Sequence, residues 1–152
     1  MRKFVFSLES LLKVKTIKKR KLEKDMAKVR QRLEEERNLL NQIKDQKAVI
    51  QGKIQKISDD GTKVYDLKEY SSFFQLLCEK IEQQTQKCQQ IEKELKSIMA
   101  ALVDIYNQID MLEKLKHNQY REYVHELEKV EERALEDLVN FKFMTRSEYI
   151  NG

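Results

Sequence analysis

The side chains that could hold a metal ion or act as a nucleophile are two cysteines, Cys78 and Cys88, and two histidines, His117 and His125. A structural zinc site needs four such ligands, with paired cysteines only a few residues apart. The cysteines here are ten residues apart and the histidines eight, whereas imidazoles on successive helical turns are four apart. We therefore predict neither a metal site nor a disulfide scaffold, and we interpret Cys88 as a small buried apolar residue.

Motifs for phosphate binding or nucleophilic catalysis are missing from the sequence. It has no glycine-rich phosphate loop and no serine nucleophile elbow, and it contains three glycines in 152 residues. Catalysis also needs a concave site that excludes water, and a pair of helices does not form one. We predict a protein that is not an enzyme and has no cofactor.

The composition favours long uninterrupted helices. Charged residues make up 37% of the chain, and proline, which removes a backbone donor inside a helix, is absent. The N-terminus begins with two positive charges, but Ser7 and Glu9 interrupt its apolar run, so it does not read as a signal peptide. No segment approaches the roughly 20 apolar residues that span a bilayer. These features predict an elongated, all-α, cytoplasmic protein.

Apolar residues recur with alternating spacings of four and three over two long stretches. This rhythm is typical of the seam of a coiled coil, and each seam needs a partner stripe. The first seam is Leu22, Met26, Val29, Leu33, Glu36, Leu40, Ile43, Lys47, Ile50, Ile54 and Ile57. The second is Tyr70, Phe74, Leu77, Ile81, Gln84, Cys88, Ile91, Leu95, Ile98, Leu102, Ile105, Ile109 and Leu112.

Turn-forming residues separate the two seams. Asp59, Asp60 and Gly61 end the first helix, and Asp66 with Glu69 forms a capping box that starts the second. A short connector between two amphipathic helices favours an antiparallel hairpin. We predict a single antiparallel coiled-coil domain over residues 1–140, with a first helix over about 7–58, a turn over about 59–65, a second helix over about 66–139, and a flexible tail over 140–152.

The second helix is longer than the first. A hairpin that folds around residue 62 places Val5 opposite about residue 119, so the chain beyond Tyr120 overhangs. Residues 121–137 of the overhang carry seven acidic side chains against three basic ones. Their apolar stripe has no partner within the predicted hairpin, so it either frays or docks elsewhere.

Positive charge gathers near the start of the chain, where residues 1–30 sum to +8 and the remainder to −4. Six of the nine residues in the segment 13–21 are basic, namely Lys13, Lys15, Lys18, Lys19, Arg20 and Lys21. Such a run is either a solvated helix face or a contact with an acidic protein, a membrane surface or nucleic acid. Two of these lysines, at positions 15 and 19, fall on seam positions and weaken the pairing, which favours a contact.

Apolar residues also flank the seams. On the second helix they are Phe73, Leu76, Met99, Val103 and Tyr106, and on the first they are Leu39 and Val49. Such residues either widen the seam or form a protein-binding patch. Phe73 is the strongest single candidate for a partner contact.

Several motifs follow one another along nearly the whole chain. They are the opening Phe4-Val5-Phe6-Ser7-Leu8-Glu9-Ser10-Leu11-Leu12, the start of the second helix at Tyr70-Ser71-Ser72-Phe73, and the late Leu112-Glu113-Lys114-Leu115-Lys116 and Glu131-Glu132-Arg133-Ala134. The order of these motifs resembles that of the FliJ family of flagellar type III export proteins. The resemblance implies an antiparallel coiled coil similar to the stalk of rotary ATPases. It also implies three partners, which are the export ATPase ring, the transmembrane export gate and export chaperones.

Carried over by position, the resemblance implies that Phe73, Leu77, Gln84 and Leu40 contact the gate, and the flanking Leu76 joins them in our prediction. Leu77 and Leu40 are also seam positions, so these residues would both pair the helices and contact the gate. On the first helix the chain has Ile43 and Lys47 where the family pattern has aromatic residues. The six basic residues of the segment 13–21 suit a stalk that enters an acidic ATPase ring, and we predict that they bind it.

The leading hypothesis is therefore a coupling protein of the export apparatus, peripheral at the cytoplasmic face of the inner membrane. One alternative is a structural coiled-coil spacer, which predicts a parallel or higher-order oligomer and indifference to Phe73. Another is a nucleic-acid-binding rod. We predict no nucleic-acid partner, because the basic segment lacks interleaved aromatic residues for base stacking.

Overall fold

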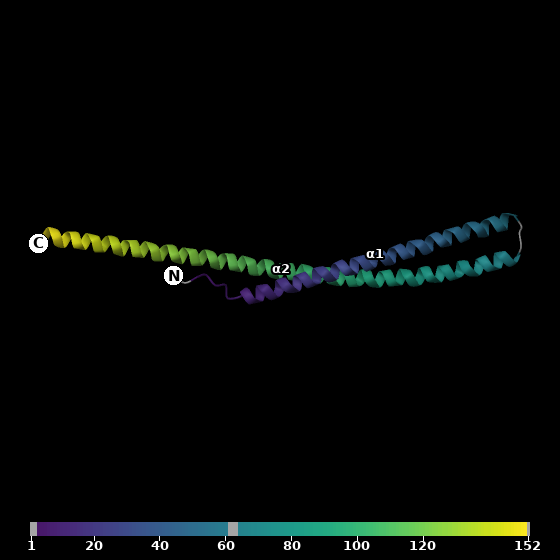
Figure 1. The fold of residues 1–152 in the computed structure, drawn as a ribbon, viewed down its shortest axis with the longest axis horizontal. Helices are drawn as coiled ribbons and strands as arrows, with labels where there is room; N and C mark the ends of the chain where they lie inside the picture. The colour runs from purple at the N-terminus through teal and green to yellow at the C-terminus, as the bar shows by residue number, and fades with distance from the viewer. Residues whose placement is uncertain (1–2, 61–63, 152) are drawn as a thin grey trace. The chain divides into compact units, whose positions relative to one another are not determined.

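The computed structural model describes residues 3–60 and 64–151, and these form two long helices, α1 (Glu9–Asp60) and α2 (Val64–Asn151) (Figure 1). The predicted all-α fold, an antiparallel coiled-coil hairpin, is confirmed. The first helix begins at Glu9 rather than near Ser7, and the second begins at Val64 rather than near Asp66. Of the predicted turn, residues 61–63 lie outside the described residues.

Both predicted seams are the buried faces of their helices. All eleven positions on α1 and all thirteen on α2 are buried or partly buried. The residues between them are mostly exposed, because a helix in a two-helix pair has a partner on one side only. The 4,3 spacing therefore located the buried faces of both helices between Leu22 and Ile57 and between Tyr70 and Leu112.

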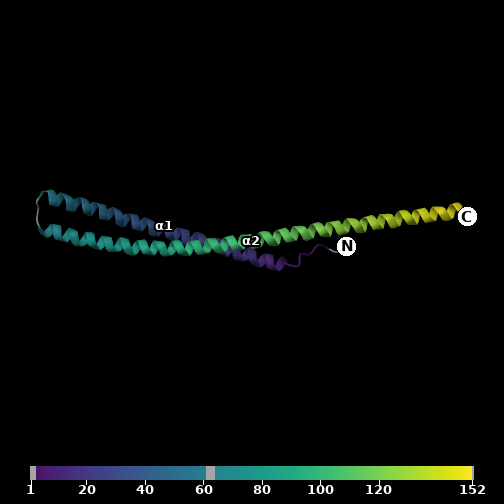
Figure 2. The same ribbon diagram turned by 180° about the vertical axis from the view of Figure 1, so that it is seen from behind.

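The contacts divide the chain into two compact units, and the first is Lys18–Asp104. Its two helical segments lie side by side, as Figure 1 and the reverse view in Figure 2 show. Their order is antiparallel, because partners on α2 come earlier in the chain as residues on α1 come later. Glu36 lies beside Lys87, Lys47 over the ring of Phe74, and Lys53 over the ring of Tyr70.

The core of this unit is a cluster of four buried side chains, Val29, Leu33, Cys88 and Ile91, with Leu40, Leu95 and Ile98 packed against it. Cys88 is 5% exposed, so its thiol is part of the apolar seam as the sequence predicted. Each of these side chains removes apolar surface from water at roughly 25 cal/mol per Å². Helix pairing is therefore the main source of stability for this unit.

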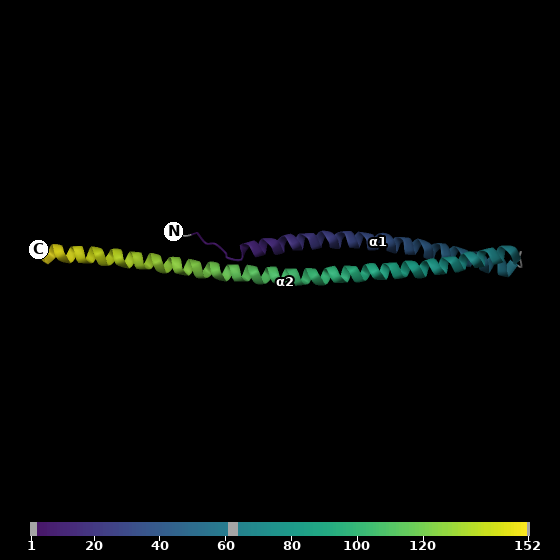
Figure 3. The ribbon, with the colours of Figure 1, turned by 90° about the horizontal axis from the view of Figure 1, so that it is seen from below.

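The second unit contains Met1–Ile17 and Ile105–Gly152. Here the start of α1 lies along α2 (Figure 3), and the Nζ atom of Lys116 is 2.9 Å from the Glu9 carboxylate. Residues 3–8 are not helical, and the backbone N–H of Glu9 donates to the carbonyl oxygen of Phe6 at 3.1 Å. This turn buries the Phe6 side chain and leaves Val5 79% exposed.

The far end of α2 has no neighbour among the described residues. Every side chain from Glu128 to Glu148 is exposed, which agrees with the predicted overhang. The helix continues to Asn151, so the loss of apolar periodicity after Asn140 does not end it. The flexibility predicted for residues 140–152 stays a prediction.

Candidate protein-binding surfaces

Two ion pairs in Lys18–Asp104 define the two flanks of the seam. In the heptad lettering, with the seam at a and d, Arg32 and Glu94 both occupy g positions and form one ion pair. Arg37 and Glu92 both occupy e positions and form the other, at 2.7 Å. Residues at g and the adjacent c positions therefore share one side, the g flank, and residues at e and b share the opposite side, the e flank.

Near the turn, the g flank carries an apolar patch made by both helices. Phe73 and Val49, 41% and 58% exposed, line one groove of about 430 Å³ together with Ile50, Asp45 and Gln46. Leu76, 44% exposed, lies on the same side of α2 three residues after Phe73. We call Val49, Phe73 and Leu76 the Phe73 patch.

The structure places the other predicted gate residues in the seam. Leu77 is 1% exposed and Gln84 is 9% exposed, while Leu40 is partly buried against the core cluster. Their side chains hold the two helices together, and a gate contact by any of them stays a prediction. Only Phe73 and Leu76 of the five offer apolar surface to a partner without any change in the helix pair.

A polar layer interrupts the apolar seam. The Nε2 group of Gln84 donates to the backbone carbonyl oxygen of Glu36 at 3.0 Å and also to its carboxylate, and Lys87 Nζ lies 3.0 Å from the same carboxylate. The hydrogen bond from Gln84 and then that from Lys87 lower the pKa of Glu36 from its usual 4.5. Because either polar group would lose its partner if the helices slid, this layer fixes the register.

The pairing of Glu36 with Gln84 was not predicted. Each is a polar residue on a mostly apolar seam. The signal was nevertheless present, because the two exceptions lie at similar sequence distances on either side of the turn. An antiparallel hairpin brings such positions together.

The basic segment lies on α1 and is mostly exposed. Lys13, Lys18, Arg20 and Lys21 are exposed, whereas Lys15 and Lys19 are partly buried, as their seam positions require. Lys13 and Lys15 belong to the unit that includes residues 105–152, and the other four belong to Lys18–Asp104. A contact of these residues with the ATPase stays a prediction.

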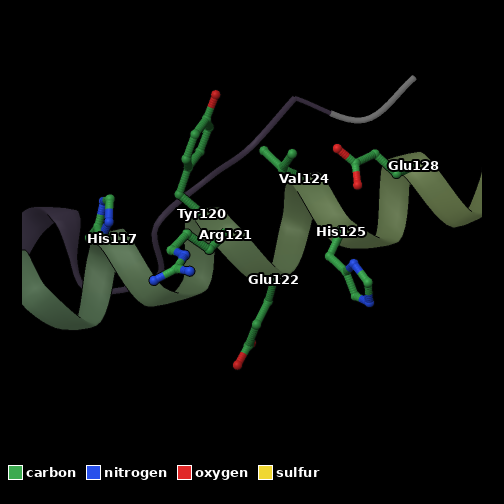
Figure 4. Close-up of a pocket in the computed structure, with 7 residues that line it drawn as sticks. All are labelled: His117, Tyr120, Arg121, Glu122, Val124, His125 and Glu128. Atoms are coloured by element: carbon green, nitrogen blue, oxygen red, sulfur yellow. The ribbon is translucent and has the colours of Figure 1, made fainter.

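In the unit with residues 105–152, α2 carries a shallow groove (Figure 4). Tyr120 and Val124 point to one side of the helix, and Glu122 and His125 point to the other. The ring of Phe4 packs against those of Tyr120 and Tyr123, with centroid distances of 5.3 and 5.6 Å. The N-terminal segment therefore covers part of the apolar stripe of α2.

No group of three or more His, Cys, Asp and Glu side chains that could hold a metal ion occurs in residues 3–60 and 64–151. Over the same part of the chain, neither helix has a stretch long and apolar enough to cross a membrane.

The arrangement of two paired helices is shared by many proteins, so the sequence must decide the family. The family model described as the flagellar FliJ protein matches residues 4–148. The chain belongs to the FliJ family. Searches of curated proteins and of solved structures gave no match. Since the family match covers nearly the whole chain, we identify it as a component of flagellar protein export.

One departure of this FliJ-family chain from the expected pattern has a structural counterpart. Lys47 stands on the seam, and its Nζ atom lies 5.4 Å from the ring centroid of Phe74 on α2. A cation over an aromatic face is favourable, and the aliphatic part of the lysine covers apolar surface. Lys47 therefore contributes to helix pairing.

Proposed function

We propose that this chain is a non-enzymatic stalk of the flagellar export apparatus that binds the export ATPase ring and the export gate and escorts export chaperones. The Phe73 patch is the observation that carries the proposal. Its three apolar side chains come from both helices and lie outside a seam that is already filled. Apolar side chains kept at the surface of a thin helical pair are typical of a binding site.

Phe73 is the side chain in this patch that a partner can use best. It is large and rigid, and it loses little conformational entropy when it becomes buried. The groove beside it is lined by Asp45 and Gln46 as well as by apolar residues, so polar groups border its apolar part. This is the usual composition of an energetically dominant contact in an interface.

The basic segment of α1 supports the proposed contact with the ATPase. Lys18, Arg20 and Lys21 are exposed and within four residues of one another. Clustered positive charges attract an acidic surface and increase the association rate. The proposed location is the cytoplasmic face of the inner membrane, reached through these partners.

The gate contact is tested by titrating the cytoplasmic part of the export gate with Phe73→Ala. We expect at least a tenfold weaker affinity, which corresponds to about 1.4 kcal/mol. Met99→Ala is the matched control, because Met99 is 43% exposed on the e flank. Equal affinities for wild type and Phe73→Ala would contradict the proposal and favour the structural spacer.

The ATPase contact is tested by reversing Lys18, Arg20 and Lys21 to glutamate and measuring hydrolysis by the export ATPase with and without this chain. Reversal should reduce any stimulation, more so at low salt, because screening already weakens the wild-type contact at high salt. Reversal of three exposed lysines on α2, Lys80, Lys93 and Lys96, is the control. Full stimulation by the first variant would exclude the basic segment as the ATPase contact.

A further inference from the structure

We propose that two copies of this chain associate, with the acidic end of α2 in each copy packing against a basic and apolar face at the start of α1 in the other. This association involves part of the basic segment proposed above for the ATPase contact, but its test uses this chain alone, so its outcome does not depend on the gate or ATPase contacts. Both surfaces belong to the unit that contains Met1–Ile17 and Ile105–Gly152.

The first surface is an exposed apolar face on the g flank of this unit. Leu11 and Leu115 are 42% and 40% exposed, and Val14 and Met111 are 59% and 69% exposed. Because Lys116 pairs with Glu9 and α2 runs opposite to α1, Leu11 lies beside Leu115 across the seam. We call these four residues the receiving face.

The receiving face is part of the most basic stretch of the chain. Val14 lies within residues 13–21, which carry six positive charges and no acidic side chain. Glu9, the acidic residue nearest to the start of this stretch, is already paired with Lys116. A helix that docks here gains from acidic side chains beside an apolar stripe.

The second surface has that chemistry. Val130, Leu138 and Phe141 are 58%, 54% and 71% exposed, and with Ala134 they follow helical spacings of four, four and three. Residues 126–141, the acidic end of α2, contain six acidic and two basic side chains. Glu131 and Asp137 lie three residues on either side of Ala134, so acidic groups border the stripe on both sides.

The two surfaces are complementary, and each copy carries both. All side chains from Glu128 to Glu148 are exposed, so the acidic end does not dock within its own chain. Two copies placed antiparallel can make the contact twice through a twofold axis, and such an isologous pair is closed. The doubled contact is what makes the pairing of two single-helix stripes stable enough to form.

The experiment is sedimentation equilibrium of the full chain at about 10–100 µM in low and high salt. We expect a concentration-dependent rise from the monomer mass of 18.3 kDa towards twice that value, weaker at high salt because the charges are screened. A constant monomer mass over this range in low salt would overturn the proposal.

A charge swap identifies the surfaces. One variant reverses the two basic residues that flank Val14, Lys13 and Lys15, to glutamate. The other reverses three acidic residues to lysine, Glu128, Glu131 and Asp137. Each variant alone presents like charges at both contacts and should associate at least tenfold more weakly, whereas their equimolar mixture should restore the dimer.

The control reverses three lysines of the other unit, Lys80, Lys93 and Lys96, to glutamate. It should leave the dimer unchanged. Helicity from circular dichroism confirms that each variant is folded. A dimer that persists in either single variant, or a mixture that stays monomeric while both variants are folded, would contradict the assigned surfaces.

Discussion

Two adjacent leucines, Leu76 and Leu77, allow the effect of burial on stability to be tested with the same substitution at both positions. Their exposed fractions are 44% and 1%. Leu77→Ala removes a side chain from the seam between α1 and α2, whereas Leu76→Ala removes one from the Phe73 patch. The same substitution at neighbouring positions should therefore have different effects on stability.

The size of the difference follows from burial. Truncating a buried leucine to alanine costs about 2–5 kcal/mol, because transfer free energy is lost and a cavity remains. A seam between two helices can partly close, so we expect about 3 kcal/mol for Leu77→Ala. For Leu76 roughly half of the transfer term applies and no cavity forms, so we expect about 1 kcal/mol.

The assay is urea unfolding followed by circular dichroism, with free energies from linear extrapolation. The difference of about 2 kcal/mol should also appear as a melting temperature about 6 °C lower for Leu77→Ala than for Leu76→Ala. Equal losses, or a larger loss for Leu76→Ala, would refute the assignment of Leu77 to the core.

Three further changes have defined outcomes. Glu36 has a lowered pKa in the folded chain, so its stabilising effect is present above pH 4.5 and is lost as the pH falls through the folded pKa. In Glu36→Gln the unfolding free energy should therefore depend less on pH over this range. Phe4→Ala removes two aromatic contacts and should cost about 1–2 kcal/mol, with faster amide hydrogen exchange at the start of α1. Arg32→Ala breaks an exposed ion pair with Glu94 and should change the unfolding free energy by less than about 1 kcal/mol.

The sequence predicted the seam well because one physical requirement dominates a two-helix pair. Each helix has only one partner, so burial follows the 4,3 spacing from Leu22 to Ile57 and from Tyr70 to Leu112. The overhang was predictable for the same reason, since the helices differ in length. These features depend on periodicity and not on the details of side-chain packing.

Other features depend on information that periodicity does not carry. Residues 3–8 are not helical, so the helical spacing does not extend to them, and Phe6 is buried there while Val5 is exposed. The Phe73 patch needs the alignment of α1 with α2, which brings Val49 next to Phe73. That alignment depends on the pairing of Glu36 with Gln84, a contact between residues 48 positions apart.

The central claim is that the seam stabilises the chain while the Phe73 patch binds its partner. Methyl NMR of the chain with and without the cytoplasmic part of the export gate tests this claim most directly. We expect the methyl signals of Val49 and Leu76 to shift on binding and those of Met99 and Val103, on the opposite flank, to stay unchanged. Shifts confined to Met99 and Val103 would contradict it.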